Sequence, residues 1–261
     1  MKILFLGDVV GKPGRLAVRS VLPRLITEEE LAFVVANCEN VAGGVGVDAR
    51  TAAELYEAGV DVLTSGNHVW RHREIAEYIE QQPSLLRPAN FPPGVPGRGW
   101  VLRETAAGHR VAVVNLIGRV FMDSVDCPFQ CAERLIAEVT KHTPIVVVDM
   151  HGEATSEKSA MGWMLAGRVT AVLGSHTHVQ TADERILPGG TAYLTDAGMC
   201  GPIDSIIGVR REQVIARFLT HMPTKFDVAG GPAIVQGAIV EIDPGSGRAV
   251  RIRRVQERSE R

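Results

Sequence analysis

Eight residues that could bind a metal ion or a phosphate group follow short apolar segments of this sequence. They comprise two carboxylates, two amides and four imidazoles: Asp8, Glu39, Asn40, Asn67, His68, His151, His176 and His178. The clearest motif is Gly174-Ser175-His176-Thr177-His178, which places two imidazoles one residue apart. Imidazole nitrogens and carboxylate oxygens are common ligands of transition metals. The residue types therefore predict metal chemistry.

This set of ligands is too large for one metal ion. Two cations, bridged by one carboxylate and one hydroxide, would use it fully. Glu39 is the candidate for the bridging carboxylate because it lies between Asp8 and Asn67 in chain order. Nitrogen and oxygen ligands without a thiolate favour Fe, Mn, Zn or Co. The side chain of Cys38 is expected to point away from the site because neighbouring residues of a strand alternate in direction.

The elements that position these side chains are expected to be buried strands, each followed by a polar turn. Apolar runs predict strands at residues 3–6, 31–36, 60–63, 145–148 and 169–173. A turn at Gly174 is expected to bring His176 and His178 toward one point. In open α/β sheets, ligands bind beyond the carboxyl ends of the strands, so the eight side chains should converge.

The remaining pattern predicts one α/β domain over residues 1–261. Helices are expected from about Pro13, over 48–58 with Asp48 as the N-cap, over 128–141 and over 212–219. Further strands are expected at 100–104, 110–115, 185–187 and 193–195, with a hairpin formed by 234–242 and 249–255. The proline- and glycine-rich segment 87–99 is interpreted as an ordered surface loop and not as a linker.

Composition limits the classes of function. Lys and Arg total 28 against 30 Asp and Glu, so the formal net charge is −2 and stable nucleic-acid binding is not expected. No run of apolar residues is long enough to cross a membrane, and the four cysteines form no regular framework. We expect a cytoplasmic protein with a small-molecule substrate; assembly into a homo-oligomer is left open.

Spacing rules out several phosphate-binding motifs. Gly7 and Gly11 are one residue too close for a P-loop, and Lys12 is followed by Pro13. The segment Gly43-Gly44-Val45-Gly46 does not match the dinucleotide-binding pattern of glycines. Ser175 lacks the flanking glycines of a nucleophile elbow. Metal-assisted chemistry remains the interpretation that uses the strand-end residues best.

The segments Gly7-Asp8, Gly66-Asn67-His68 and Gly174–His178 resemble the strand-end motifs of the calcineurin-like metallophosphoesterases. Three departures are informative: Val10 replaces a histidine, Glu39 lies where a Gly-Asp pair is usual, and Val69 replaces an aspartate. Together with the segment Thr195–Pro202, these departures resemble the bacterial YmdB family. The resemblance covers essentially the whole chain.

This resemblance implies a four-layer α/β/β/α sandwich, a pair of divalent or mixed-valence metal ions (Fe or Mn), and phosphodiesterase activity on 2′,3′-cyclic nucleotides. By position it assigns Asp8, Glu39 and His178 to one metal, and Glu39, Asn67, His151 and His176 to the other. Asn40 is expected at the edge of the site, as a metal ligand or a substrate contact. His68 is expected beside the substrate phosphate as the catalytic acid, while a metal-bridging hydroxide attacks phosphorus.

Two other functions remain open. The same centre could serve a phosphomonoesterase or a nuclease, which differ only in the substrate pocket. The chain could also be a non-catalytic regulator that binds metal and a nucleotide. Trp70 and Phe121 could stack on a base, although core packing is expected for both.

Overall fold

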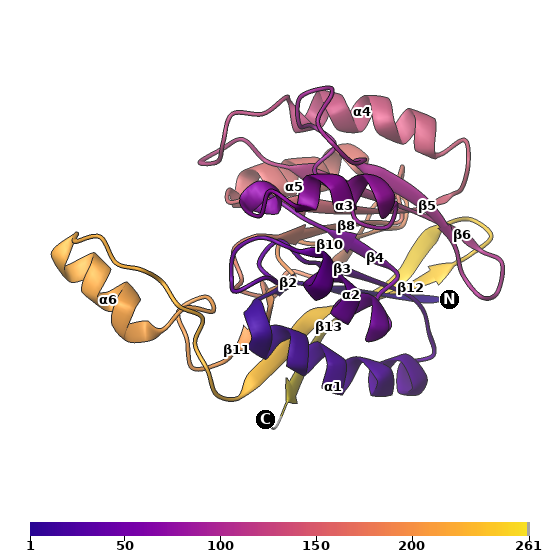
Figure 1. Ribbon diagram of the computed structural model, residues 1–261. Coiled ribbons are helices and arrows are strands. Elements are labelled where there is room, and N and C mark those ends of the chain that lie inside the picture. The colour runs from indigo at the N-terminus through magenta and orange to yellow at the C-terminus, as the bar shows by residue number, and fades with distance from the viewer. Residues whose placement is uncertain (260–261) are drawn as a thin grey trace.

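The computed structural model describes residues 1–259, which form a mixed α/β fold with two β-sheets and six α-helices (Figure 1). The first sheet has the strand order β2-β11-β12-β1-β3-β4, with β13 paired to β12. Its strands are β1 (Lys2–Leu6), β2 (Asp8–Val9), β3 (Leu31–Asn37), β4 (Val62–Thr64), β11 (Met199–Pro202), β12 (Ala233–Asp243) and β13 (Arg248–Ser259).

The second sheet has the strand order β5-β6-β7-β8-β10-β9. Its strands are β5 (Trp100–Glu104), β6 (Arg110–Ile117), β7 (Ile145–His151), β8 (Ala171–Ser175), β9 (Arg185–Leu187) and β10 (Thr191–Leu194). The helices are α1 (Gly11–Glu29), α2 (Ala49–Glu57), α3 (Ile75–Gln81), α4 (Pro128–Val139), α5 (Thr155–Leu165) and α6 (Arg211–Thr220), and a short 3₁₀ helix, η1, covers Val69–Arg71.

Alternation of side chains along the strands separates two apolar clusters. Ile3 and Phe5 of β1 pack with residues from both sheets, whereas Leu4 and Leu6 pack with α1 and its neighbours. A third cluster joins the second sheet to α4 and α5. Successive side chains of a strand point to opposite faces, so each strand of this kind contributes to two clusters. Figure 1 shows α1 and α4 on opposite sides of the molecule.

Parallel pairing aligns the strand ends that carry the polar residues. β1, β3 and β4 are parallel neighbours in the first sheet, and β6, β7 and β8 are parallel neighbours in the second. His151 pairs with Ser175, and Asn37 pairs with Thr64. Parallel strands end at the same edge of a sheet, so the two sheets present their carboxyl ends together.

The structure confirms most of the expected elements, including the C-terminal hairpin and the capping of α2 by Asp48. The turn expected at Gly174 is wrong, because β8 continues through Ser175. Gly174 is needed for close packing, since a Cβ there would collide with the carbonyl oxygen of Thr195. The expected strand 60–63 lies slightly later, at Val62–Thr64. Helices α3 and α5 and strands β2 and β11 were not expected from the sequence.

Candidate metal centre

The structure brings all eight strand-end residues into one connected set of contacts. Asp8 lies in β2, directly after the glycine that follows β1, and Glu39 and Asn40 lie in the turn after β3. Asn67 and His68 lie between β4 and η1, His151 ends β7, and His176 and His178 follow β8. β3 lies between β1 and β4 in the first sheet. Glu39, which follows β3, therefore lies between Asp8, which follows β1, and Asn67 and His68, which follow β4.

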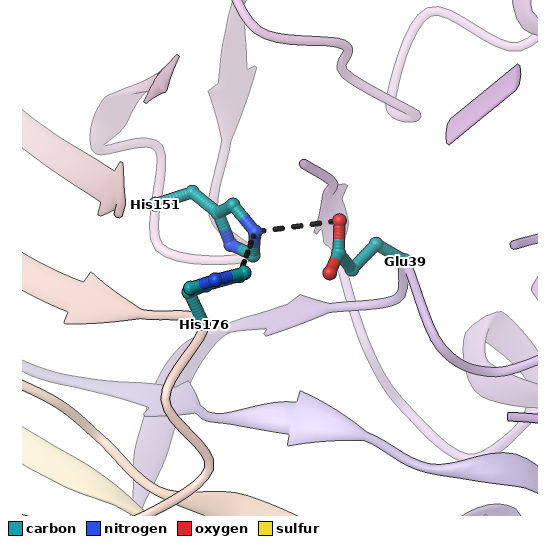
Figure 2. Close-up of side chains that lie close together, drawn as sticks. All are labelled: Glu39, His151 and His176. Carbon is teal, nitrogen blue, oxygen red and sulfur yellow. Dashed lines mark hydrogen bonds and ion pairs between the residues drawn. The ribbon is translucent and has the colours of Figure 1, made fainter. Parts of the chain in front are cut away.

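Glu39, His151 and His176 form the centre of this set (Figure 2). One ligand atom from each lies within 4.8 Å of the others. His151 Nε2 is 3.3 Å from Glu39 Oε2 and 3.1 Å from His176 Nδ1. Asn67 Oδ1 is 3.2 Å from the same nitrogen of His151. Four ligand-type side chains therefore approach one another from both sheets.

Asp8, Asn40 and His178 lie on the other side of Glu39. Asn40 Nδ2 donates to Glu39 Oε1 at 3.3 Å and approaches His178 Nε2 at 3.1 Å. Asp8 Oδ1 is 3.7 Å from the same His178 nitrogen, and Asp8 Oδ2 accepts a hydrogen bond from the backbone of His176. Within residues 1–259, Asp8 Oδ1 is buried without a hydrogen-bond partner.

The orientation of His178 leaves Nε2 facing this group. Its Nδ1 donates to the carbonyl oxygen of Ile207 at 2.8 Å, so the neutral ring keeps a lone pair on Nε2. His176 and His178 have positive φ angles of 104° and 64°, which L-residues rarely adopt. The backbone of this turn is therefore strained where both rings face the strand ends. Strain of this kind is common at functional sites.

The ring of His151 is fixed by a buried hydrogen-bonded chain. Its Nδ1 donates to Ser175 Oγ at 2.9 Å, and Ser175 Oγ donates to Asp149 Oδ1 at 2.6 Å. Asp149 Oδ2 accepts hydrogen bonds from Asn37 and Thr64. Bonds of this type fix the tautomer of a metal-binding imidazole and leave its Nε2 free to ligate.

His68 lies at the edge of the cluster and lines a cavity of about 330 Å³ together with Glu39, His176 and His178. Its Nδ1 donates to Asn40 Oδ1 at 2.9 Å. Its side chain is 37% exposed, whereas that of Glu39 is 1% exposed, so His68 is reachable from the cavity. The oxygen of Asn40 faces His68, and ligation of a metal through this oxygen requires the amide to rotate.

The charges of the cluster shift its pKa values strongly. Burial raises the pKa of Asp8 to about 6, although His178 and His151 oppose this change. Burial also acts to raise the pKa of Glu39, but His151 and His68 hold it well below 4.5. Burial acts to lower the pKa of His151, yet the carboxylates, Glu39 first, raise it to about 9. Burial and the nearby His151 lower the pKa of His176 to about 3.

These residues fit a metal centre. Two buried carboxylates and three imidazoles would otherwise require pairing by hydrogen bonds, and Asp8 Oδ1 has no such partner among the described residues. A cation at this point would satisfy that oxygen. Gly66 also lies so close to Glu39 and His151 that a Cβ would collide with both side chains. The donors are nitrogen and oxygen atoms, which suit Fe, Mn, Zn or Co.

Several residues of the site were not identified from the sequence. Glu153 Oε2 lies 3.2 Å from His176 Nε2, and its position two residues after His151 was an available signal. Asp149 and Ser175 were also detectable as polar residues at the ends of apolar strands. The sequence contains no sign of the contact between the Ile207 carbonyl and His178, because every residue has a backbone carbonyl group.

The two aromatic residues differ from each other. Phe121 is 88% exposed, so the expectation that it packs in the core is wrong. It lies in the turn after β6 with a positive φ of 62°. Trp70 is partly buried and packs against the core, as expected.

Cys38 is buried in the apolar cluster beside α1, away from the ligand atoms. No helix among residues 1–259 has the length and apolarity needed to cross a membrane.

The fold and the cluster of ligand-type side chains define a mixed α/β protein with a candidate metal centre at its strand ends. The chain belongs to the YmdB-like protein family, whose model matches residues 4–255. It is 49% identical to a 2′,3′-cyclic-nucleotide 2′-phosphodiesterase of Bacillus subtilis, over 98% of this chain and 96% of that protein.

Two solved structures are similar over nearly their full length. A crystal structure of a hypothetical protein from Thermus thermophilus has a TM-score of 0.93 and 42% identity, covering 99% of both chains. A crystal structure of a novel phosphatase from Mycoplasma pneumoniae also has a TM-score of 0.93, with 32% identity, and covers 100% of this chain and 94% of that one.

Proposed function

We propose that this protein is a metal-dependent phosphodiesterase that hydrolyses 2′,3′-cyclic nucleotides to nucleoside monophosphates. The observation that carries this proposal is the buried cluster of Asp8, Glu39 and the imidazoles at the joined strand ends, with one carboxylate oxygen left unpartnered among the described residues. The full-length similarity to a 2′,3′-cyclic-nucleotide 2′-phosphodiesterase supports the choice of substrate.

Two metal ions, iron or manganese, would be held by this cluster. Asp8, Glu39 and His178 would hold one, and Glu39, Asn67, His151 and His176 would hold the other. When bound, such ions activate a water molecule and bind phosphate oxygens. The bonds of His151 to Ser175 and of His178 to Ile207 hold the proton on Nδ1 of each ring, so Nε2 is the nitrogen that each neutral ring would offer to a metal ion.

His68 would act on the leaving group. Asn40 accepts the Nδ1 proton of His68, so Nε2 is the nitrogen available to the cavity. During hydrolysis water adds to phosphorus, the bond from phosphorus to one ribose oxygen breaks, and that oxygen takes a proton. A protonated His68 would donate this proton and would stabilise the negative charge on the phosphate.

The substitution His68→Ala tests this role. We expect turnover of 2′,3′-cAMP by Mn²⁺-loaded protein to fall by about two orders of magnitude or more, the usual effect of removing a general acid. Metal content, measured by elemental analysis, should stay unchanged. Loss of metal from this variant would instead place His68 among the ligands.

The same assay separates the alternatives. Hydrolysis of nitrophenyl phosphate but not of cyclic nucleotides would identify a phosphomonoesterase, and cleavage of polynucleotides would identify a nuclease. A metal-loaded protein that hydrolyses no phosphoester would be a regulator that binds metal and a nucleotide.

We further propose a single domain with a four-layer α/β/β/α arrangement, located in the cytoplasm. The three apolar clusters, one between the sheets and one under the helices on each side, support the layering. We also propose self-association. Helix α6 stands apart from the body in Figure 1 and exposes Phe218 and Leu219, whose accessibilities are 75% and 80%.

A further inference from the structure

A second cavity adjoins the metal centre on the side of Asn67. It has a volume of about 200 Å³, and its walls include Asn67, Trp70, Phe91, Val95, Ile117 and Asp123. Apart from Asn67 and Asp123, the described residues that line it are apolar. This cavity is distinct from the larger one that His68 lines.

Asn67 and His68 are neighbours in the sequence that line different cavities. Both precede η1, which contains Trp70. Asn67 and Trp70 line the smaller cavity, whereas His68 lines the larger one. Asn67 Oδ1 is also 3.2 Å from His151 Nε2. A ligand whose phosphate lies at the imidazole cluster can therefore extend past Asn67 into the smaller cavity.

The walls of this cavity suit a flat, uncharged ring. Trp70 and Phe91 are partly buried, with ring centroids 6.3 Å apart and an interplanar angle of 37°. Asp123 is the one charged residue among the described residues that line the cavity. A carboxylate repels a phosphate but accepts hydrogen bonds from ring N–H and amino groups. Aromatic side chains stack on any base, because every base has a π-face.

We infer that this cavity binds the nucleobase of the substrate, with Trp70 and Phe91 as the stacking residues. This inference rests on the proposed phosphodiesterase function. The larger cavity is the alternative site for the base, because aliphatic side chains, including Val45, Ile207 and Val228, line part of it. No Phe, Tyr or Trp lies among the described residues that line it, so it lacks a stacking surface. It holds the polar groups that the phosphate and ribose require.

The experiment compares two substrates that differ only in the base. These are 2′,3′-cAMP and 1-O-methylribose 2′,3′-cyclic phosphate, both assayed with Mn²⁺-loaded full-length protein. For Trp70→Ala we expect kcat/KM for 2′,3′-cAMP to fall by about 10- to 100-fold, mainly through KM, since stacking on one base contributes about 1–3 kcal/mol. The value for the substrate without a base should change by less than about twofold, because that substrate makes no contact with the ring.

Control variants keep this test independent of folding and of the proposed function. Trp70→Phe retains a ring and should keep most of the activity on 2′,3′-cAMP, and Trp163→Ala, at a 54% exposed position on α5, should behave as wild type. Quenching of tryptophan fluorescence by 3′-AMP should be present in the wild type and reduced in Trp70→Phe.

Three results would overturn the inference. The first is an equal loss on both substrates in Trp70→Ala, and the second is no loss on either substrate. The third is a base-selective loss in Val228→Ala and not in Trp70→Ala, which would place the base against the aliphatic wall. If the wild-type protein hydrolyses neither substrate, the proposed function itself fails, and the two failures are thus distinguishable.

Discussion

Asp8 shows how a single buried residue can oppose folding until its ligand arrives. Its carboxyl group is fully buried, and one oxygen has no partner among the described residues. Burial raises its pKa from 3.8 to about 6, so the ionised form of Asp8 is penalised in the folded protein without metal. The stability that this group contributes is complete below about pH 4 and is lost as the pH rises through 6.

The substitution Asp8→Asn should therefore stabilise the metal-free protein above pH 6. A shift of about two pH units corresponds to a gain on the order of 3 kcal/mol in the free energy of unfolding at pH 8. The gain should disappear below about pH 3, where Asp8 is protonated in both the folded and the unfolded state. Urea unfolding in EDTA at several pH values measures this difference.

With saturating Mn²⁺ the wild type should instead be more stable than Asp8→Asn, because the variant lacks one predicted metal ligand. A variant that is less stable than the wild type in EDTA at pH 8 would show that the buried carboxylate is compensated by a contact other than a metal.

The role of a residue was predictable from the sequence only where its side-chain type determines that role. His176, His178 and Glu39 were predicted as metal ligands from their residue types and from their positions after apolar segments. The φ angles of 104° and 64° at His176 and His178 depend on the packing of β8 against the segment after β10, which spacing does not encode. The carbonyl of Ile207 reaches His178 from 29 residues away, and no residue type marks it.

Helix α5 supports the turn that carries His176 and His178. Its Lys158 is buried and forms an ion pair of 2.7 Å with Asp196, at side-chain accessibilities of 2% and 1%. Asp196 Oδ2 also accepts a hydrogen bond from the backbone N–H of Thr177, between the two imidazoles. The ion pair therefore connects a helix of the second sheet to the strained turn.

The substitution Lys158→Met should reduce the free energy of unfolding by about 3–5 kcal/mol, because it leaves the charge of Asp196 buried without its partner. Adding Asp196→Asn should recover part of this loss. Arg168→Met is the matched control, since Arg168 forms a 2.7 Å ion pair with Glu133 at exposed positions and should cost less than about 1 kcal/mol. Equal losses in the two single variants, measured by urea unfolding, would contradict this account.

Helix α5 also shows why some elements could not be predicted. Its segment buries Glu157 and Lys158 as well as Met161 and Leu165, so the apolar periodicity that marks an amphipathic helix is interrupted. Strand β2 has two residues and forms because Met199 pairs with Asp8 across the chain. Such a strand depends on a distant partner, whereas β7, with its run of valines, has a strong local preference.

At the scale of the whole molecule, the rest of the chain leaves most of α6 uncovered. Of its residues, only Val214 is buried, and Ile215, Phe218 and Leu219 are exposed. Exposed apolar patches of this kind are typical of protein–protein contacts. If a second copy of the chain covers α6, this face accounts for the proposed self-association.

The substitution Phe218→Asp should then reduce the mass of the protein in solution, measured by light scattering after gel filtration, toward that of one 28.2 kDa chain. The charge would be unfavourable in an apolar contact. Trp163→Asp, at an exposed position on α5, is the control and should leave the mass unchanged. A wild-type protein that already has the mass of one chain would contradict self-association.

The position of β12 has a consequence for how the protein is made. This strand lies between β11 and β1, and the carbonyl of its Gln236 accepts the hydrogen bond of Gly7, next to Asp8. A nascent chain that has left the ribosome only as far as residue 232 already holds all eight ligand-type side chains, yet its first strand lacks this neighbour. The last hairpin therefore completes the first sheet beside Asp8, and we expect metal to be loaded only after this hairpin has been made.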